Sequence, residues 1–240
     1  MIKKNKGVRI AVAQFNAIRG DIDKNSYEQL ELIKSASESG VDIIVFPELS
    51  LTGYELDISS SLKVSSVDTY NLKFQQISDK LNITSVIGVP VFDELSLPKL
   101  GAIVFSPGKE PVTASKINLH QHELEYFTPS DSVVTFTIKG LVFGLAICAD
   151  SLDERHISIL DELGVDCCLA PSLITEKGYD NDLAILRKYA KKYDMCLAFS
   201  NYIGKSGGFS ATGKSAIINR SSQVVSQASV NEIGFVYADI

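Results

Sequence analysis

The chain has 240 residues, of which 45% are hydrophobic and 22% charged, and its formal net charge is −6. This composition is typical of a soluble globular protein with a sizeable core. The negative charge, together with the absence of any long basic run, argues against nucleic acid or an anionic membrane as the main partner.

No stretch of the sequence approaches the roughly 20 apolar residues of a membrane span. The basic start lacks the apolar region of a signal peptide, because Gln14 and Asn16 interrupt the first hydrophobic run. The cysteines show no C-x-x-C spacing and lie at positions 148, 167, 168 and 196. We therefore expect a cytoplasmic protein with free, reduced thiols.

The first half of the chain alternates predicted strands and helices. Residues 8–15 alternate β-branched and apolar positions, as strands do, and residues 41–48 form a second, buried run. Between them, Asp23 and Asn25 are the expected caps of a helix that stops at Gly40. After a polar loop at 50–66, the pattern predicts a helix at about 67–81 and strands at 83–92, 99–107 and 111–119.

The second half repeats this rhythm. Residues 133–138 and 141–147 predict a hairpin that turns at Lys139 and Gly140. Helices predicted at about 152–163 and 179–193 alternate with strands at 165–171 and 195–203, and three short strands close the chain. Both halves therefore combine helix–strand units with a strand meander, which predicts an α/β protein with sheets inside and helices outside.

The chain is organised around the segment GLVFGLAICADS, residues 140–151. Its apolar run predicts a strand buried on both faces, and the run ends at Cys148. A thiol at the point where a buried strand opens into a loop is well placed for chemistry, because α/β sheets carry their sites outside the ends of their strands. The alternative is a packed core cysteine, since free cysteines are among the most buried residues.

Two further ionisable side chains follow predicted strands in the same way. Glu48 comes after VDIIVFP and Lys116 comes after PVTAS, as Cys148 comes after FGLAI. Lysine and glutamate are seldom fully buried unless they are paired. A carboxylate, an ammonium and a thiol at strand ends therefore predict a shared site, and surface charges that cap the strands are the alternative.

These residues carry a resemblance to the carbon–nitrogen hydrolase (nitrilase) superfamily. F-P-E at 46–48, S-K-I-N-L at 115–119 and I-C-A-D at 147–150 are similar to its three signature segments. Further similar segments, in the same order, are Ala13-Gln14, L-T-G-Y at 51–54, E-x-x-Y-F-T-P-x-D at 123–131, S-N-Y-I-G at 200–204 and G-K-S at 213–215. The resemblance implies a four-layer αββα sandwich with two central sheets and outer helices. No linker divides the chain, so we expect a single domain over residues 1–240.

The resemblance also implies roles for the site residues. Glu48, Lys116 and Cys148 match the family's Glu–Lys–Cys triad. Glu123 matches a second, structural glutamate. In such a triad the carboxylate takes the thiol proton, and the thiolate attacks a carbonyl carbon. The ammonium and a backbone N–H, here that of Ala149, stabilise the oxyanion before a thioester forms and is hydrolysed.

The residues around the nucleophile set expectations for the substrate. Tyr54 is expected to line the pocket. The C-x-D form of Cys148-Ala149-Asp150 resembles the amidase and carbamoylase branches, whereas true nitrilases generally place Trp-Glu after the cysteine. We therefore expect cleavage of a small amide or ureido C–N bond, with release of ammonia or an amine. The segment ADSLDERH departs from the family pattern, and within it Arg155 either pairs with a substrate carboxylate or faces solvent.

Two motifs indicate other classes of protein. GFSATGKS at 208–215 matches a phosphate-binding loop, but a β-branched, turn-rich segment follows it in place of the helix that such a loop requires. His120 and His122, in an H-x-H-E cluster, leave a metal-dependent hydrolase as an alternative, although structural zinc usually needs four nitrogen or sulfur ligands. Cys167 and Cys168 are expected to fill the core.

The sequence therefore predicts a cysteine amidohydrolase that uses no metal and no organic cofactor. Its expected partner is a small-molecule amide. A homodimer or larger assembly is expected from the resemblance and from the apolar C-terminal segment IGFVYADI. The alternative from another class is a catalytically inactive regulatory or binding protein on the same fold, in which ADSLDERH closes the pocket.

Overall fold

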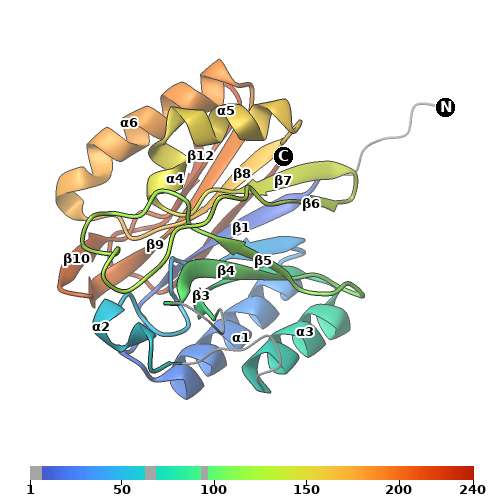
Figure 1. The fold of residues 1–240 in the computed structure, drawn as a ribbon. Coiled ribbons are helices and arrows are strands. Elements are labelled where there is room, and N and C mark those ends of the chain that lie inside the picture. Colours follow the sequence, from blue (N-terminus) through green and yellow to red (C-terminus); the bar gives the residue numbers. More distant parts are fainter. Residues whose placement is uncertain (1–6, 63–68, 93–96) are drawn as a thin grey trace.

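The computed structural model describes residues 7–62, 69–92 and 97–240 (Figure 1). The helices in these ranges are α1 (Ile22–Glu38), α2 (Leu56–Ser59), α3 (Thr69–Leu81), α4 (Ala149–Leu152), α5 (Glu154–Glu162) and α6 (Glu176–Lys192). The strands are β1 (Arg9–Phe15), β2 (Ile43–Val45), β3 (Thr84–Val91), β4 (Lys99–Phe105), β5 (Val112–Ser115), β6 (Thr135–Ile138), β7 (Leu141–Leu145), β8 (Cys167–Pro171), β9 (Cys196–Ser206), β10 (Phe209–Thr212), β11 (Ala216–Ile218), β12 (Val224–Gln227) and β13 (Gly234–Asp239).

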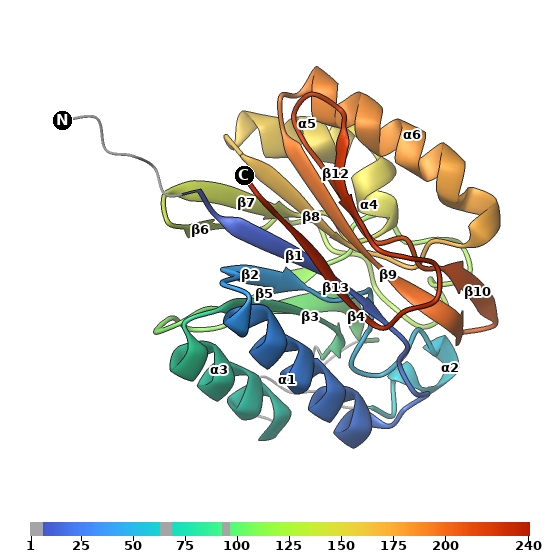
Figure 2. The same cartoon turned by 180° about the vertical axis from the view of Figure 1, so that it is seen from behind.

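The strands join in the order β5-β4-β3-β2-β1-β9-β8-β7-β6. At the centre of this order, β1 pairs with β9 through only two residue pairs, Gln14 with Asn201 and Phe15 with Tyr202. On either side of this junction the two halves of the sheet face each other as separate layers (Figure 1). β13 adds to β1 in the first half-sheet, and β11 and β12 extend the second half-sheet beyond β9 (Figure 2).

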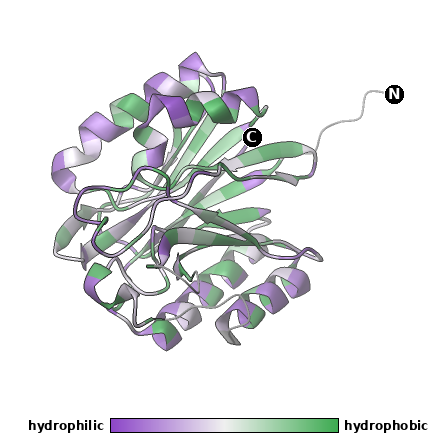
Figure 3. Ribbon diagram, in the orientation of Figure 1, coloured by the Kyte–Doolittle hydropathy of each residue, from purple (hydrophilic) through white to green (hydrophobic). Residues whose placement is uncertain are grey.

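Alternate side chains of each strand enter different layers of the protein. In β1, Ile10 and Val12 belong to the core between the half-sheets, whereas Ala11 and Ala13 pack on the side of the helices. α1 and α3 cover the outer face of the first half-sheet, and α5 and α6 cover that of the second. Figure 3 shows apolar strands between helices whose outward faces are hydrophilic. The predicted αββα sandwich is confirmed.

The adjacent cysteines of β8 follow the same alternation. Cys167 lies in the core between the half-sheets, and Cys168 lies in the layer between the sheet and α5 and α6. Both are fully buried, as is expected of residues that fill the core. Cys196 of β9 is the register partner of Cys167 and faces the same inner layer.

The cap of α1 differs from the predicted one, because another side chain accepts a hydrogen bond from the first turn of the helix. Asp21, rather than Asp23 or Asn25, caps α1. Asn25 is instead buried inside the helix face, where its amide bonds the backbone of Ile18 and Leu51. The prediction of Asp23 and Asn25 as caps was therefore wrong.

Other boundaries shift for similar reasons. The helix predicted at 152–163 corresponds to α5, which begins at Glu154 because Asp153 is extended and caps it, and the separate short helix α4 ends at Leu152. The strand predicted at 111–119 ends at Ser115, and the polar loop predicted at 50–66 contains α2. Residues 63–66 of that loop and the first two residues of the helix predicted at 67–81 lie outside the described residues. In the part of the chain that the structure describes, no helix has both the length and the hydropathy that crossing a membrane requires.

The topology brings three strand ends to one edge of the sandwich. β2 and β3 run parallel, and β5 has the direction of β3 because two antiparallel pairings through β4 separate them. β7 is parallel to β8 and β9, and β9 is parallel to β1, which is parallel to β2. The carboxyl ends of β2, β5 and β7 therefore lie at the same edge. Glu48, Lys116 and Cys148 follow these three strands.

Candidate active site

Lys116 is the centre of a buried ion cluster. Its side chain is fully buried, and Nζ donates hydrogen bonds to Oε1 of Glu48 (2.8 Å) and to Oε1 of Glu123 (2.7 Å). Two buried carboxylates coexist here because the ammonium lies between them. Among the described residues, the third N–H of the ammonium has no acceptor and Oε2 of Glu48 has no donor. The cluster therefore offers one donor and one acceptor to a bound molecule.

The charges of this cluster shift one another's pKa values. Burial raises the pKa of Glu48 to about 7 against the opposing effect of Lys116, and the Glu123 carboxylate adds to the rise. Burial also opposes the charge on Lys116, but Glu48 and its neighbours outweigh it and raise the pKa of the ammonium. For Glu123, burial is outweighed by Lys116, which lowers the pKa of the carboxyl. At neutral pH Glu48 is thus near the midpoint of its titration, where a group can both take and give a proton.

Cys148 lies at a strained turn between β7 and α4. Its φ of 49° and ψ of −104° fall in a region that residues other than glycine rarely occupy. Hydrogen bonds maintain this turn: the Cys148 N–H donates to the Pro171 carbonyl (2.9 Å), and the Cys148 carbonyl accepts from the N–H (3.0 Å) and the Oγ (2.7 Å) of Ser151. A strained backbone that its surroundings over-determine is typical of functional residues.

The Cys148 thiol lies beside the ion cluster. Burial, followed by the Glu48 carboxylate, raises the pKa of the thiol, and Lys116 acts in the opposite direction. Sγ also makes a long hydrogen bond of 3.9 Å to the carbonyl of Leu173. Because the pKa of the thiol is raised, little thiolate exists at neutral pH, and the sulfur needs a base before it can act as a nucleophile. Glu48 is the carboxylate in place to supply that base.

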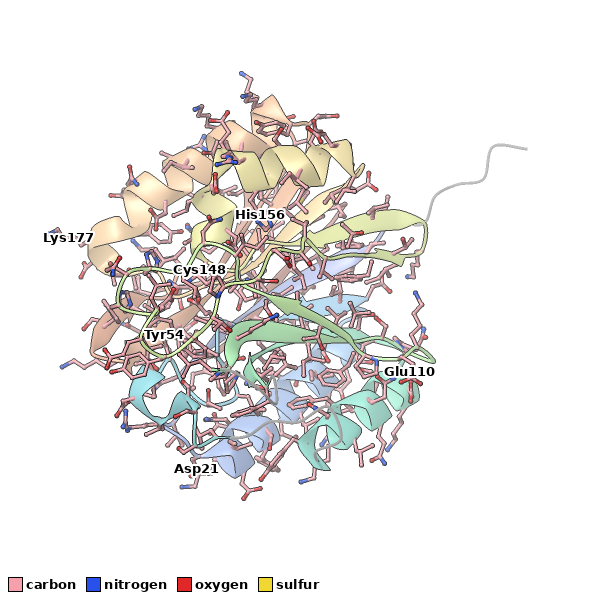
Figure 4. The ribbon with its side chains drawn as sticks, in the orientation of Figure 1. Asp21, Tyr54, Glu110, Cys148, His156 and Lys177 are labelled. Carbon is pink, nitrogen blue, oxygen red and sulfur yellow. The ribbon has the colours of Figure 1, made fainter. Side chains whose placement is uncertain are left out.

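Tyr54 and His122 extend the cluster towards the surface. The Tyr54 hydroxyl donates to Oε1 of Glu123, whose Oε2 accepts the N–H of His120 (2.7 Å). The single proton of Tyr54 is thus used, so Nε2 of His122 is the donor in its 3.1 Å contact with the hydroxyl. The exposed ring of His122 stacks on that of His120, with 5.5 Å between centroids. Figure 4 shows Tyr54 and Cys148 on the same side of the molecule.

Close backbone packing fixes the loop that carries Glu48. A Cβ on Gly88 of β3 would lie 2.3 Å from the carbonyl oxygen of Pro47 and 2.4 Å from the nitrogen of Leu49, so only glycine permits this approach. The buried hydroxyl of Tyr202 donates to the Glu48 carbonyl (2.7 Å) from the opposite half-sheet. The loop is therefore held from two sides.

The two residues after Cys148 face different partners. The Asp150 carboxylate accepts hydrogen bonds from the backbone N–H groups of Ile117 and Asn118, directly after Lys116. The N–H of Ala149 begins α4 and has no acceptor among the described residues. This N–H is adjacent to Cys148 in sequence and is available to bind an oxyanion.

The histidines and the GFSATGKS segment lie in surroundings that fit a structural role. In the described ranges, no three His, Cys, Asp or Glu side chains converge in a way that could hold a metal ion, and His156 is buried on α5 with Nε2 3.0 Å from the Leu145 carbonyl. GFSATGKS forms β10 and a turn, and strand β11 follows it instead of a helix. The Ser215 hydroxyl bonds the Ala13 carbonyl and the N–H of Asn201, where the half-sheets join.

The structure adds neighbours of the site that the sequence analysis missed. The Leu173 contact is made by a backbone carbonyl, for which no side-chain signal exists. Tyr202 belongs to the S-N-Y-I-G segment, so that motif was the available signal. The sequence indicated His122 only as part of a possible metal cluster, and its spacing to Tyr54 carries no signal. Arg155, the candidate partner of a substrate carboxylate, is exposed on the outer helix α5.

A model of the carbon–nitrogen hydrolase family matches residues 9–240. The glutamine-dependent NAD(+) synthetase of Acinetobacter baylyi is 28% identical over 232 residues, which cover 93% of this chain and 42% of that protein. The glutamine-dependent NAD(+) synthetase of Thermotoga maritima is 27% identical over 98% of this chain and 42% of its own length. The nitrilase of Pyrococcus abyssi is 26% identical over 94% of this chain and 86% of its own. The chain thus spans about two fifths of the length of the two synthetases.

Solved structures of an amidase from Nesterenkonia sp. AN1 share the fold. One variant of that amidase carries the acetamide moiety of fluoroacetamide on its active-site cysteine. It matches this chain with a TM-score of 0.89 at 21% identity, covering 100% of this chain and 93% of that one. Another variant, in complex with butyramide, matches with a TM-score of 0.89 at 21% identity and covers 99% and 92%.

Proposed function

Because the chain belongs to the carbon–nitrogen hydrolase family, we propose that it is a cysteine-dependent amidohydrolase that cleaves an amide or ureido C–N bond of a small molecule. One observation carries this proposal. The buried cluster beside Cys148 holds one unused N–H on Lys116 and one unused oxygen on Glu48. An acyl-transfer reaction needs a donor for the developing oxyanion and a base for the nucleophile, and this cluster provides both.

In the first half-reaction, Glu48 takes the proton of the Cys148 thiol and sulfur bonds to the carbonyl carbon. The π electron pair of the carbonyl moves to oxygen, where the free N–H of Lys116 and that of Ala149 stabilise the charge. Removing one such donor typically lowers the rate about a hundredfold or more. When the C–N bond breaks, the nitrogen takes the proton from Glu48, ammonia or an amine leaves, and a thioester to Cys148 remains.

In the second half-reaction, Glu48 takes a proton from water, and the water oxygen attacks the thioester carbon. Breaking the C–S bond then returns the proton from Glu48 to sulfur and releases the acid. One carboxyl thus acts twice as base and twice as acid. A pKa raised to about 7 suits this alternation at neutral pH, because neither form of Glu48 is strongly favoured.

A second candidate substrate is the side-chain amide of glutamine. The relatives at 27–28% identity that are named glutamine-dependent NAD(+) synthetases support it. The chain spans 42% of their length, so we propose for it only release of ammonia from the amide and not the synthetase reaction. The C-x-D form after the nucleophile still favours amide-type substrates over nitriles.

The test compares an aliphatic amide, an N-carbamoyl acid, glutamine and a matching nitrile by product release, with Cys148→Ala as the blank. Selective alkylation of Cys148 by iodoacetamide is measured in parallel. We expect an amide-type substrate to be turned over fastest. Faster turnover of the nitrile would overturn the proposed bond class. Absence of both turnover and selective alkylation would instead favour the inactive regulatory or binding protein.

A further inference from the structure

Asp150 makes an unusual set of contacts for a buried carboxylate. It is 1% exposed, and its Oδ1 accepts the N–H (2.7 Å) and the side-chain Nδ2 (3.0 Å) of Asn118. Both carboxylate oxygens share the N–H of Ile117 at 3.2 Å. Among the described residues no lysine, arginine or histidine forms an ion pair with it. Its charge is therefore balanced by N–H donors of one short segment, the one that directly follows Lys116.

The N–H groups that bond Asp150 directly follow Lys116 in the chain, so this contact bears on the position of the lysine. Lys116 directly follows β5, an edge strand whose one strand partner in the described chain is β4. The Lys116 N–H bonds the Leu100 carbonyl (2.7 Å), and the Lys116 carbonyl accepts from Ser130 (2.9 Å). Neither bond reaches the segment that carries the nucleophile. In the described chain, hydrogen bonds between residues 116–119 and residues 147–152 are made by the Asp150 carboxylate alone.

We propose that Asp150 is a positioning residue that clamps the backbone after Lys116 to the nucleophile turn and so sets the distance between the Lys116 ammonium and the Cys148 thiol. This inference rests on the proposed function of that site. Lys116 and Cys148 belong to opposite half-sheets, so their separation depends on how the two halves are tied together at this edge. Displacing a reacting group by about 1 Å can cost roughly a hundredfold in rate.

The experiment compares Asp150→Ala and Asp150→Asn with Asn118→Ala, which removes one donor of the clamp without changing the nucleophile segment. Asp153→Ala is the matched control, because Asp153 also accepts a backbone N–H, that of Arg155 (2.9 Å), but caps the outer helix α5. Each variant is assayed below its melting temperature for kcat, KM and the pH dependence of Cys148 alkylation by iodoacetamide.

We expect Asp150→Ala to lower kcat about tenfold or more while KM changes by about twofold or less, since the chemical step is affected and not binding. The alkylation profile should move to higher pH, because a displaced ammonium favours the thiolate less. Asp150→Asn keeps an acceptor oxygen and should restore part of kcat, and Asn118→Ala should show a smaller loss of the same kind. Asp153→Ala should change neither kcat nor the profile.

Two results would overturn the inference. One is an Asp150→Ala or Asp150→Asn protein that is less stable but keeps the wild-type kcat and alkylation profile. The other is an Asp153→Ala protein that shows the same kinetic losses, which would indicate a general loosening of the segment. If Asp150→Ala does not fold, kcat and the alkylation profile of Asp150→Asn and Asn118→Ala test the inference. If the wild type hydrolyses neither an amide nor a ureido substrate, the proposed function fails, while the alkylation profile still tests the positioning.

Discussion

Replacing Lys116 by methionine removes the charge between Glu48 and Glu123 and leaves a side chain of similar length. All three side chains are at most 1% exposed, so solvent cannot take the place of the ammonium. Breaking a buried ion pair by removing one partner typically costs about 3–5 kcal/mol. Here two carboxylates lose the same partner, and the charge of Glu123, which already raises the pKa of Glu48, would then act without opposition.

The cost should depend on pH. In the wild type, the lowered pKa of Glu123 contributes stability above the ordinary value of 4.5 that is lost as pH falls through the folded-state pKa. In Lys116→Met we expect both carboxyl pKa values to be raised, so the folded state binds more protons than the unfolded state and stability falls as pH rises. The pKa of Glu48 is already raised in the wild type, so its contribution to stability falls with rising pH in both proteins. The difference between wild type and variant should therefore reach about 3–5 kcal/mol near pH 8 and be smaller near pH 5.

Urea unfolding of both proteins near pH 5, pH 6.5 and pH 8 measures this difference. Lys24→Met is the control, because its ion pair with Asp21 has a lysine side chain that is 68% exposed, and such pairs contribute little. A Lys116→Met protein as stable as the wild type near pH 8 would refute the reasoning. An equal loss at all three pH values would also refute it, since the cost would then not come from uncompensated carboxylates.

Three further predictions concern the nucleophile, the base and the assembly. Cys148→Ala should abolish turnover and leave unfolding unchanged, whereas Cys167→Ala, in the core between the half-sheets, should lower stability by about 1 kcal/mol and retain turnover; more than a trace of hydrolysis by the first variant would contradict the mechanism. Glu48→Gln alone should be nearly as inactive as the double variant with Cys148→Ala, and independent, multiplicative losses would show that the two residues do not act as a unit. Light scattering should give a homodimer or larger assembly, and a monomer at working concentration would remove that proposal.

The position of the site could be predicted from the sequence because buried strands end there in ionisable residues. Lysine and glutamate are rarely buried without partners, so Glu48 and Lys116 after apolar runs already indicated a pairing. The resemblance then added Glu123, which follows no strand and which periodicity alone could not identify. The structure places Lys116 within hydrogen-bond distance of both glutamates.

Side-chain contacts between residues that lie far apart in the chain could not be predicted. The partner of Asp150 lies 32 residues away in the chain, and that of Tyr54 lies 69 residues away. Helix caps were mispredicted where two acceptors compete, because Asp21 and Asp23 have the same chemistry and Asp23 already lies within the first turn of α1. The hydrophobic periodicity of a sequence predicts the face of a helix or strand on which a residue lies. Which residue it contacts there depends on how the helices and strands pack.

Side-chain hydrogen bonds between the half-sheets supplement the short β-ladder that joins them. β1 and β9 share only two residue pairs, so the ladder alone ties the halves weakly. Side chains of the second half bond backbone groups of the first half: the Tyr202 hydroxyl to the Glu48 carbonyl (2.7 Å) and the Ser200 hydroxyl to the Ala13 carbonyl (2.6 Å). The Asp150 carboxylate accepts from the first half in the same way. A side chain that bonds the backbone at or next to a reacting group fixes that group without contacting the substrate, so substitutions of Tyr202 and Asp150 should change kcat more than KM.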